Sequence, residues 1–335
     1  MDKISECILN RNSSFVPIWF MRQAGRYLPE FREIRKNNQD FIKLCLNRDL
    51  VKEITLQPIN RFNLDAAIIF SDILMIPYGL GQEVKFKKNF GPILGDLIIE
   101  DILSIDLEEF IKKNTPVYKA ITEVKKKINH QSLIGFVGAP WTLLVYMMNK
   151  QSPKKDFDLS LIKNNKNECI KLLRKIEEAT CLHIEMQIKA GANIIQIFDS
   201  WAGLLPKDML DEFCFEPNSR LTEYLKEKKT PAICFPRGIG KEYSNFCQKV
   251  KPTCINIDYD VDPNWAKENF NGIPIQGGMD PKILIEDKST IKKETENYLN
   301  IFKNYPYIFN LGHGVLPETK PETISYVIKV IREKK

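Results

Sequence analysis

The sequence has few of the residues that hold structural metals. Its 335 residues include only three histidines, far apart in the chain, and eight cysteines without a CxxC pair. Zinc sites need closely spaced His and Cys ligands, and a disulfide framework is typical of a short, cysteine-rich secreted chain. We therefore expect no metal site and no disulfide scaffold. Scattered, unpaired cysteines are typical of the reducing cytoplasm.

Long hydrophobic runs are also missing. The longest apolar stretch, around Gly135–Met148, is too short and too interrupted to span a bilayer. Residues Met1–Asn10 mix charges among their apolar residues, which excludes a signal peptide. No Gly/Ser-rich linker or low-complexity block divides the chain, so we expect one domain over residues 1–335, without a membrane partner.

Positive charge is in small excess over negative charge. The formal net charge of +6 is mild for this length and does not indicate a nucleic-acid partner. The distribution of arginine is more informative, because six of the eleven arginines lie within the first 48 residues. Arginine forms fixed, bidentate contacts with carboxylate or phosphate. The N-terminal region therefore favours an anionic ligand.

Familiar cofactor and nucleophile motifs are absent as well. The sequence contains no Rossmann or P-loop glycine pattern, and Ser200 does not lie in a GxSxG elbow. We therefore predict neither a nucleotide cofactor nor a serine nucleophile, and expect an enzyme without a cofactor.

Eight short apolar runs are present, spread from one end of the chain to the other. Buried parallel strands read as continuous apolar runs, and eight strand–helix units in about 300 residues predict an α/β fold, a closed (β/α)8 TIM barrel. An amphipathic outer helix is expected over 167–190, a hairpin or lid-like excursion near the mouth of the barrel over 79–95, and a last helix over 321–335. The runs are Val16–Phe20, Ala66–Phe70, Leu133–Val137, Asn193–Phe198, Pro231–Phe235, Cys254–Asp258, Ile273–Gly277 and Tyr307–Gly312.

Nearly every run is followed by a residue able to do chemistry. Active sites of such barrels lie at the carboxyl ends of the strands, so these residues are expected to meet there. In chain order they are Arg22, Asp72, Tyr146, Ser200, Arg237, Asp258, Asp280 and His313.

The segment Met21–Arg32 follows the first run and reads MRQAGRYLPEFR. Arg22 and Arg26 bracket Gly25, which allows a sharp bend, and this arrangement suits a ligand with several carboxylates or phosphates. The alternative is that these arginines form ion pairs with Glu30 or Glu33.

Four single residues complete the candidate site. Asp72 ends an apolar strand, where a carboxylate must be paired or bonded, or it caps the following helix. Tyr146 offers a hydroxyl on an apolar body, or is a plain core tyrosine. Asp199 and Ser200 follow the fourth run and could be a catalytic pair or an ordinary helix cap. His313, between two glycines, can donate a hydrogen bond or carry a proton.

Five motifs in the same order resemble the uroporphyrinogen decarboxylase family over essentially the whole chain. One loop departs from the family pattern: Gly278 and Met279 stand where the family usually has Asn-Leu. The motifs are Arg22–Arg32, Phe70–Leu74, Gly138–Thr142, Phe198–Gly203 and Asn310–Gly314.

The resemblance implies cofactor-independent removal of CO2 from the four acetate side chains of uroporphyrinogen III, giving coproporphyrinogen III. It implies that Asp72 faces the pyrrole N–H groups and that Arg22 is a candidate proton donor. It also implies a homodimer. The residues it assigns to substrate binding are Arg22, Gln23, Ala24, Gly25, Arg26, Asp72, Tyr146, Ser200 and His313.

Two other functions stay open on the sequence. Zinc- and corrinoid-linked methyltransferases share the barrel, but they typically use a His-x-Cys pair, which does not occur here. A non-catalytic tetrapyrrole binder would keep the pocket and release no CO2.

Overall fold

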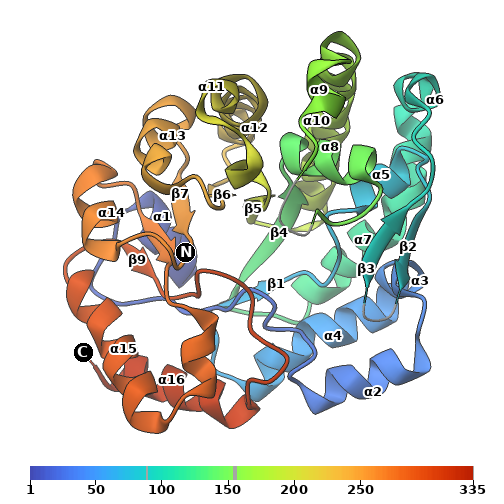
Figure 1. Ribbon diagram of the computed structural model, residues 1–335. Coiled ribbons are helices and arrows are strands. Elements are labelled where there is room, and N and C mark those ends of the chain that lie inside the picture. The colour runs from blue at the N-terminus through green and yellow to red at the C-terminus, as the bar shows by residue number, and fades with distance from the viewer. Residues whose placement is uncertain (88–89, 154–156, 335) are drawn as a thin grey trace.

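The chain forms an α/β fold around a curled parallel sheet of seven strands (Figure 1). The computed structural model describes residues 1–87, 90–153 and 157–334. The strand order is β1-β4-β5-β6-β7-β8-β9, so neighbours in the sheet follow one another along the chain. The strands are β1 (Ala66–Ile68), β4 (Ser132–Gly138), β5 (Ile194–Asp199), β6 (Ala232–Pro236), β7 (Cys254–Ile257), β8 (Ile275–Gly277) and β9 (Tyr307–Ile308).

Seven of the eight apolar runs contain these strands, as predicted. Their Ile-rich sequences are buried on both faces, because helices cover the outside and side chains fill the inside of the curl. The last run is strand only at Tyr307–Ile308, since beyond it Leu311 forms an isolated bridge with Met279 instead of a continuous ladder.

The first run, Val16–Phe20, is not a strand of this sheet, which corrects the prediction of eight. Ile18 makes an isolated parallel bridge to Phe309, and its carbonyl accepts from the main-chain N–H of Asp65 at 2.9 Å. The N–H of Ile18, however, donates to the Asp65 carboxylate at 2.8 Å. A side chain thus takes the place of a main-chain partner, and a regular ladder does not form.

Polar side chains cross the inside of the curl. The Gln276 amide donates to Gln196 Oε1 at 3.0 Å and to Asn256 Oδ1 at 2.6 Å, and it accepts from the Trp19 indole at 2.8 Å. These four residues are fully buried, and the bonds tie β5, β7 and β8 to the first run. Buried amides bonded in this way fix the relative height of the strands.

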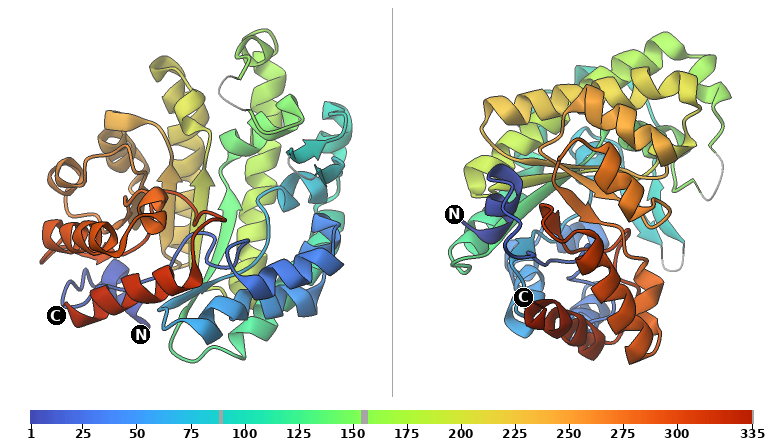
Figure 2. Two further views of the ribbon diagram at one scale, coloured as in Figure 1. Left: turned by 60° about the horizontal axis from the view of Figure 1, so that its bottom comes forward. Right: turned by 90° about the vertical axis from the view of Figure 1, so that its left-hand side faces the viewer.

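Helices surround the sheet (Figure 2). The predicted helix over 167–190 is α10, which ends at Gly191 with a φ of 118°, and the predicted last helix is α16. The helices are α1 (Lys3–Leu9), α2 (Pro29–Asn37), α3 (Phe41–Cys45), α4 (Arg48–Arg61), α5 (Met75–Gly79), α6 (Ile99–Ser104), α7 (Leu107–Lys125), α8 (Pro140–Asn149), α9 (Ser160–Lys163), α10 (Lys166–Ala190), α11 (Lys207–Leu210), α12 (Glu216–Glu227), α13 (Tyr243–Val250), α14 (Pro263–Asn269), α15 (Lys288–Ile301) and α16 (Pro321–Glu333).

The excursion predicted over 79–95 is an antiparallel hairpin of β2 (Val84–Lys87) and β3 (Gly91–Leu94). At the amino-terminal end of the sheet, both chain termini meet Asp65, which pairs with Lys3 at 3.0 Å and with Arg332 at 2.6 Å. The opposite end is left for the loops that carry the candidate site. No helix in the described part of the chain is long and apolar enough to cross a membrane.

Candidate active site

The loop after the first run holds Arg22 in a left-handed conformation, with a φ of 64°. Such a backbone is uncommon for a residue with a side chain and persists only where the surroundings impose it. Asn310 Oδ1 accepts from the Met21 N–H at 2.9 Å, and the Met21 carbonyl accepts from the Val315 N–H at 2.9 Å. The segment after β9 therefore fixes the main chain next to Arg22.

Gln23 supports the same loop through buried hydrogen bonds. Its side chain is fully buried, with Oε1 accepting from the Phe20 N–H at 3.1 Å and Nε2 donating to the Ala66 carbonyl at 3.0 Å. Its own carbonyl accepts from the Tyr27 hydroxyl at 2.8 Å. Gln23, which the resemblance assigns to substrate binding, thus has both ends of its amide bonded inside the protein.

The Arg22 side chain runs across Gly314, where an added Cβ would collide with its Cδ. Arg22 keeps part of its surface in solvent, yet the protein around the guanidinium displaces water and lowers its pKa. The charges of Arg26 and Arg237 lower this pKa further, whereas Asp72 and Tyr146 raise it. Groups from three loops and one helix therefore lie close enough to act on one guanidinium.

Asp72 follows β1 and is partly buried. Its Oδ1 accepts from the Leu74 N–H at 2.9 Å, while the helix that follows, α5, has Leu74 and not Asp72 at its cap position. Burial raises the pKa of Asp72 to about 6, against the lowering effects of the Leu74 N–H and of Arg22. The helix-cap alternative is wrong, and Oδ2 has no hydrogen-bond donor among the described residues.

Tyr146 lies on α8, and its ring packs edge-on against Trp201 at 6.0 Å between centroids. Burial is the main cause of its raised pKa, and the negative charge of Asp72 adds to it. Tyr146 is thus a neutral hydroxyl on the same side of the fold as Asp72 and Arg22.

Ser200 lies in the turn after β5, beside a buried network that shapes this turn. Asp199 accepts from Thr142 Oγ1 at 2.7 Å and from Asn218 Nδ2 at 3.0 Å, and burial raises its pKa to about 6. Thr142 Oγ1 in turn accepts from the Trp201 N–H at 3.0 Å. Asp199 supports this turn through its buried hydrogen bonds, while Ser200 stays partly exposed.

His313 follows β9, and its Nδ1 accepts from the Gly314 N–H at 2.8 Å. Burial lowers the pKa of His313 to about 3, and the charges of Arg22 and Arg237 act in the same direction. His313 is therefore neutral at pH 7. Because Nδ1 accepts, the proton is on Nε2, which is a hydrogen-bond donor.

The ion-pair alternative for the first loop is not what the structure contains. Glu30 pairs with Arg61 at 3.1 Å, and neither Arg22 nor Arg26 has an acidic partner within ion-pair distance in residues 1–87, 90–153 and 157–334. Arg237, a strand-end residue of the sequence analysis, follows β6 and is half-buried, with its main chain bonded to Asp199 and Gly203. Its charge lowers the pKa of both Arg22 and His313.

The backbone of the loop after β8 accounts for Gly278, where this loop departs from the family pattern. Gly278 has a φ of 100°, and an added Cβ would lie 2.8 Å from Tyr298 Cε1 and 3.0 Å from Ile257 Cδ1. A glycine suits this backbone, and nothing here places a polar side chain toward the site. Met279 is buried and bridges to Leu311.

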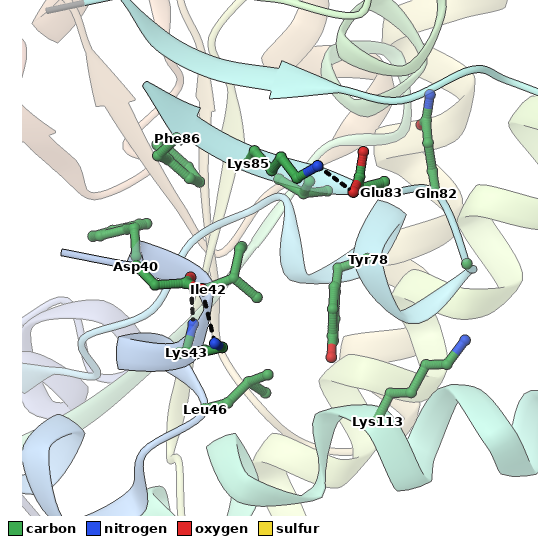
Figure 3. Close-up of a pocket in the computed structure, with 13 residues that line it drawn as sticks. Asp40, Ile42, Lys43, Leu46, Tyr78, Gln82, Glu83, Lys85, Phe86 and Lys113 are labelled. Carbon is green, nitrogen blue, oxygen red and sulfur yellow. Dashed lines mark hydrogen bonds and ion pairs between the residues drawn. The ribbon is translucent and has the colours of Figure 1, made fainter. Parts of the chain in front are cut away.

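A pocket of about 580 Å3 lies to one side of these residues, between α3 and the hairpin strand β2 (Figure 3). None of the predicted site residues lines it. Its three lysines already have acidic partners, because Lys43 lies 3.7 Å from Asp40, Lys85 lies 2.5 Å from Glu83 and Lys113 lies 3.0 Å from Glu109. The pocket thus offers no unpaired charge to a ligand. In the described residues, no group of three His, Cys, Asp or Glu side chains could hold a metal ion.

The model of the family described as "Uroporphyrinogen decarboxylase (URO-D)" matches residues 1–334. The chain belongs to the uroporphyrinogen decarboxylase family. A uroporphyrinogen decarboxylase of Rickettsia bellii is 43% identical over 95% of this chain and 94% of its own length. One from Wolbachia pipientis wMel is 40% identical over 97% and 96%.

A solved structure with the same fold is a methyltransferase from Methanosarcina mazei. It has a TM-score of 0.78, covers 98% of this chain and 96% of its own, and is 14% identical. A B12-independent methionine synthase from Shewanella sp. W3-18-1 has a TM-score of 0.53 and 12% identity over 86% and 88% of the two chains. At such identities the likeness establishes the fold alone.

Proposed function

We propose that this member of the uroporphyrinogen decarboxylase family converts uroporphyrinogen III to coproporphyrinogen III in porphyrin biosynthesis. In each of four steps, one acetate side chain loses CO2 and gains a proton to become a methyl group. The observation that carries the proposal is the partly buried carboxylate of Asp72 beside unpaired arginines. It fits a ligand with acidic arms around a core of N–H donors.

The reaction needs an electron sink, and the substrate can provide it. Protonation of a pyrrole ring carbon makes the ring a cation, which accepts the electron pair left by departing CO2. An ionised Asp72 next to this cation stabilises the charge that develops in the transition state. With a pKa of about 6, Asp72 is mostly ionised at pH 7. Its unbonded Oδ2 is suited to accept from the pyrrole N–H groups.

We further propose that Arg22 and Arg26 bind substrate carboxylates. Neither has an acidic partner, so a bound carboxylate would satisfy groups that the described protein leaves unpaired. Arg22 also has a pKa lowered by burial, which favours it as the candidate proton donor. Ala24 and Gly25 would let the loop backbone approach the ligand.

The remaining contacts in this proposal are single neutral donors. The Nε2–H of His313 and the hydroxyls of Tyr146 and Ser200 would each donate to a substrate oxygen. Neutral donors complement the charged arginines without adding positive charge. Gln23 is assigned a supporting role for the Arg22 loop, because its amide is already bonded.

We also propose the finer architecture that the apolar runs predict and the homodimer that the resemblance implies. The first run would take the place of the eighth strand and close the barrel within a single domain. The bridge of Ile18 to Phe309 and its main-chain hydrogen bond with Asp65 support this. The chain would work as a cytoplasmic homodimer, and eight unpaired cysteines suit a reducing compartment. Sedimentation velocity of the purified protein tests the dimer.

Anaerobic incubation of purified protein with uroporphyrinogen III, followed by oxidation and porphyrin chromatography, tests the function. We expect stepwise loss of four carboxyl groups, ending at coproporphyrin, without an added cofactor. A folded protein that binds the substrate and releases no CO2 would be the tetrapyrrole binder. Activity that requires zinc and a methyl donor would instead identify the methyltransferase of the same barrel.

A further inference from the structure

Within the described residues, seven of the eleven arginines bond to protein groups. Of the other four, Arg11 is exposed after α1, and three lie near the carboxyl ends of the strands. The described residues leave Arg22, Arg26 and Arg237 without an acidic partner or a side-chain hydrogen bond. Arg32 and Arg35 donate to main-chain carbonyls. The arginines that form ion pairs are Arg48, Arg61, Arg174, Arg220 and Arg332.

The main chain of Arg237 is held on both sides. Its N–H donates to the Asp199 carbonyl at 3.1 Å, and its carbonyl accepts from the Gly203 N–H at 3.0 Å. The next residue, Gly238, donates its N–H to Asp258 Oδ2 at 2.8 Å. The loop after β6 is thereby tied to the carboxyl ends of β5 and β7, so the base of the Arg237 side chain has one position.

Arg237 approaches the site from a different side than Arg22. Arg237 follows β6, the middle strand of the seven. Arg22 follows the first run, which makes a bridge to Phe309 just after β9 and a hydrogen bond to Asp65 just before β1. β1 and β9 are the two outer strands of the sheet. Because the sheet curls, these loops face each other across its carboxyl end (Figure 1). The Arg237 side chain is half-buried and close enough to act on Arg22 and His313.

Three like charges around one space cost free energy in the ligand-free protein. Asp72 supplies a single negative charge nearby, and His313 is neutral. The excess positive charge is explained by a ligand that brings several negative charges of its own. A tetrapyrrole with four acetates and four propionates does so.

We propose that Arg237 is a third carboxylate-binding arginine, which holds an acidic arm of the substrate from the β6 side of the site. This inference rests on the proposed function and extends it to a residue outside the motifs of the first loop. Arg237 positions the substrate, while the chemistry stays with Asp72 and its proton donor.

The test uses Arg237→Gln and Arg237→Lys, with Arg48→Gln as a control, because Arg48 pairs with Asp49 on the surface. Arg237→Gln should raise KM for uroporphyrinogen III about 10-fold or more, with kcat within about twofold, since a contact kept throughout the reaction affects binding alone. Arg237→Lys should raise KM less, because lysine keeps the positive charge and loses only the paired N–H donors of the guanidinium. Arg48→Gln should change neither constant.

Stability separates binding from a structural role. Removing a like charge beside Arg22 should leave the Tm of ligand-free Arg237→Gln equal to or above that of the wild type. A lower Tm, or an unchanged KM in Arg237→Gln, would overturn the proposal. Fluorescence titration with uroporphyrin III gives a readout independent of turnover, and weaker binding by Arg237→Gln is expected there. An inactive wild type would defeat the proposed function, and this titration would still decide for or against Arg237.

Discussion

At the scale of single residues, the environment of Asp72 sets its chemistry. Burial raises its pKa to about 6, while the Leu74 N–H and Arg22 keep the carboxylate accessible to ionisation at pH 7. The carboxylate is therefore less stable in the folded protein than in water, and a ligand with N–H donors relieves this cost. Function and stability make opposite demands at this position.

Asp72→Asn should lower kcat by about 10²–10³-fold, because the ring cation loses its counter-charge. The same change should raise Tm at pH 7 by about 2 °C. The folded pKa lies above the ordinary value of 3.8, so the ionised carboxylate costs stability above pH 6, and this cost disappears as pH falls from 6 toward 3.8. Steady-state kinetics and calorimetry measure both effects, with exposed Asp49→Asn as the control. A near-normal kcat would remove the electrostatic role.

The pH profile should have its acid limb at the pKa of Asp72. We expect kcat/KM to be level above about pH 6 and to fall tenfold per unit below it, because the protonated carboxyl no longer carries charge. A midpoint near 6 would ordinarily suggest a histidine. His313, however, has a pKa of about 3. His313→Asn should therefore keep the same midpoint, and loss of the limb in this variant would assign it to His313 instead.

At the scale of elements, the loop after the first run is positioned by bonds that come from distant strands. Gln23 ties it to the start of β1 at Ala66, and Asn310 ties it to the segment after β9. Arg22 can keep a left-handed backbone because these contacts hold both sides of the residue. The network Asn218–Asp199–Thr142 does the same for the turn that carries Ser200.

Gln23→Ala tests whether this residue supports the loop. The change leaves the Phe20 N–H and the Ala66 carbonyl without their partners, so the free energy of unfolding should fall by about 1–3 kcal/mol. KM should rise because Arg22 is less well held. Thermal denaturation with and without uroporphyrin measures this, and exposed Gln39→Ala serves as the control. An unchanged Tm with weaker binding would mean direct contact with the substrate.

At the scale of the whole molecule, the stabilising contacts and the candidate site lie at different levels along the sheet. The amino-terminal end is closed by Asp65, which joins both terminal helices through Lys3 and Arg332. The buried amide layer of Gln196, Asn256 and Gln276 fills the middle. The carboxyl end gathers the unpaired arginines, Asp72 and His313.

Removal of metal ions should leave the molecule active. The eight cysteines are unpaired, seven are buried, and burial raises the pKa of Cys234 and Cys254, which disfavours the thiolate that zinc needs. Dialysis against EDTA should leave kcat and Tm unchanged, measured beside a sample with zinc restored. Reversible loss of activity on chelation would bring back the zinc methyltransferase.

The sequence by itself determined where seven of the eight expected strands lie and their order along the chain. Runs such as Ile194–Asp199 are apolar on both faces, and the residue after each run is placed at one end of a parallel sheet by geometry alone. Family membership could also be read from the motifs, because they are long and ordered.

Only the tertiary structure decided which polar groups are already satisfied. The sequence could not tell that the Asp65 carboxylate takes the N–H of Ile18 and interrupts an eighth strand, or that both ends of the Gln23 amide are used inside the protein. It also could not separate Arg237, which has no acidic partner among the described residues, from Arg220, which pairs with Glu177 at 2.7 Å. Hydrogen bonds and ion pairs join residues far apart in the chain, and local patterns carry no record of them.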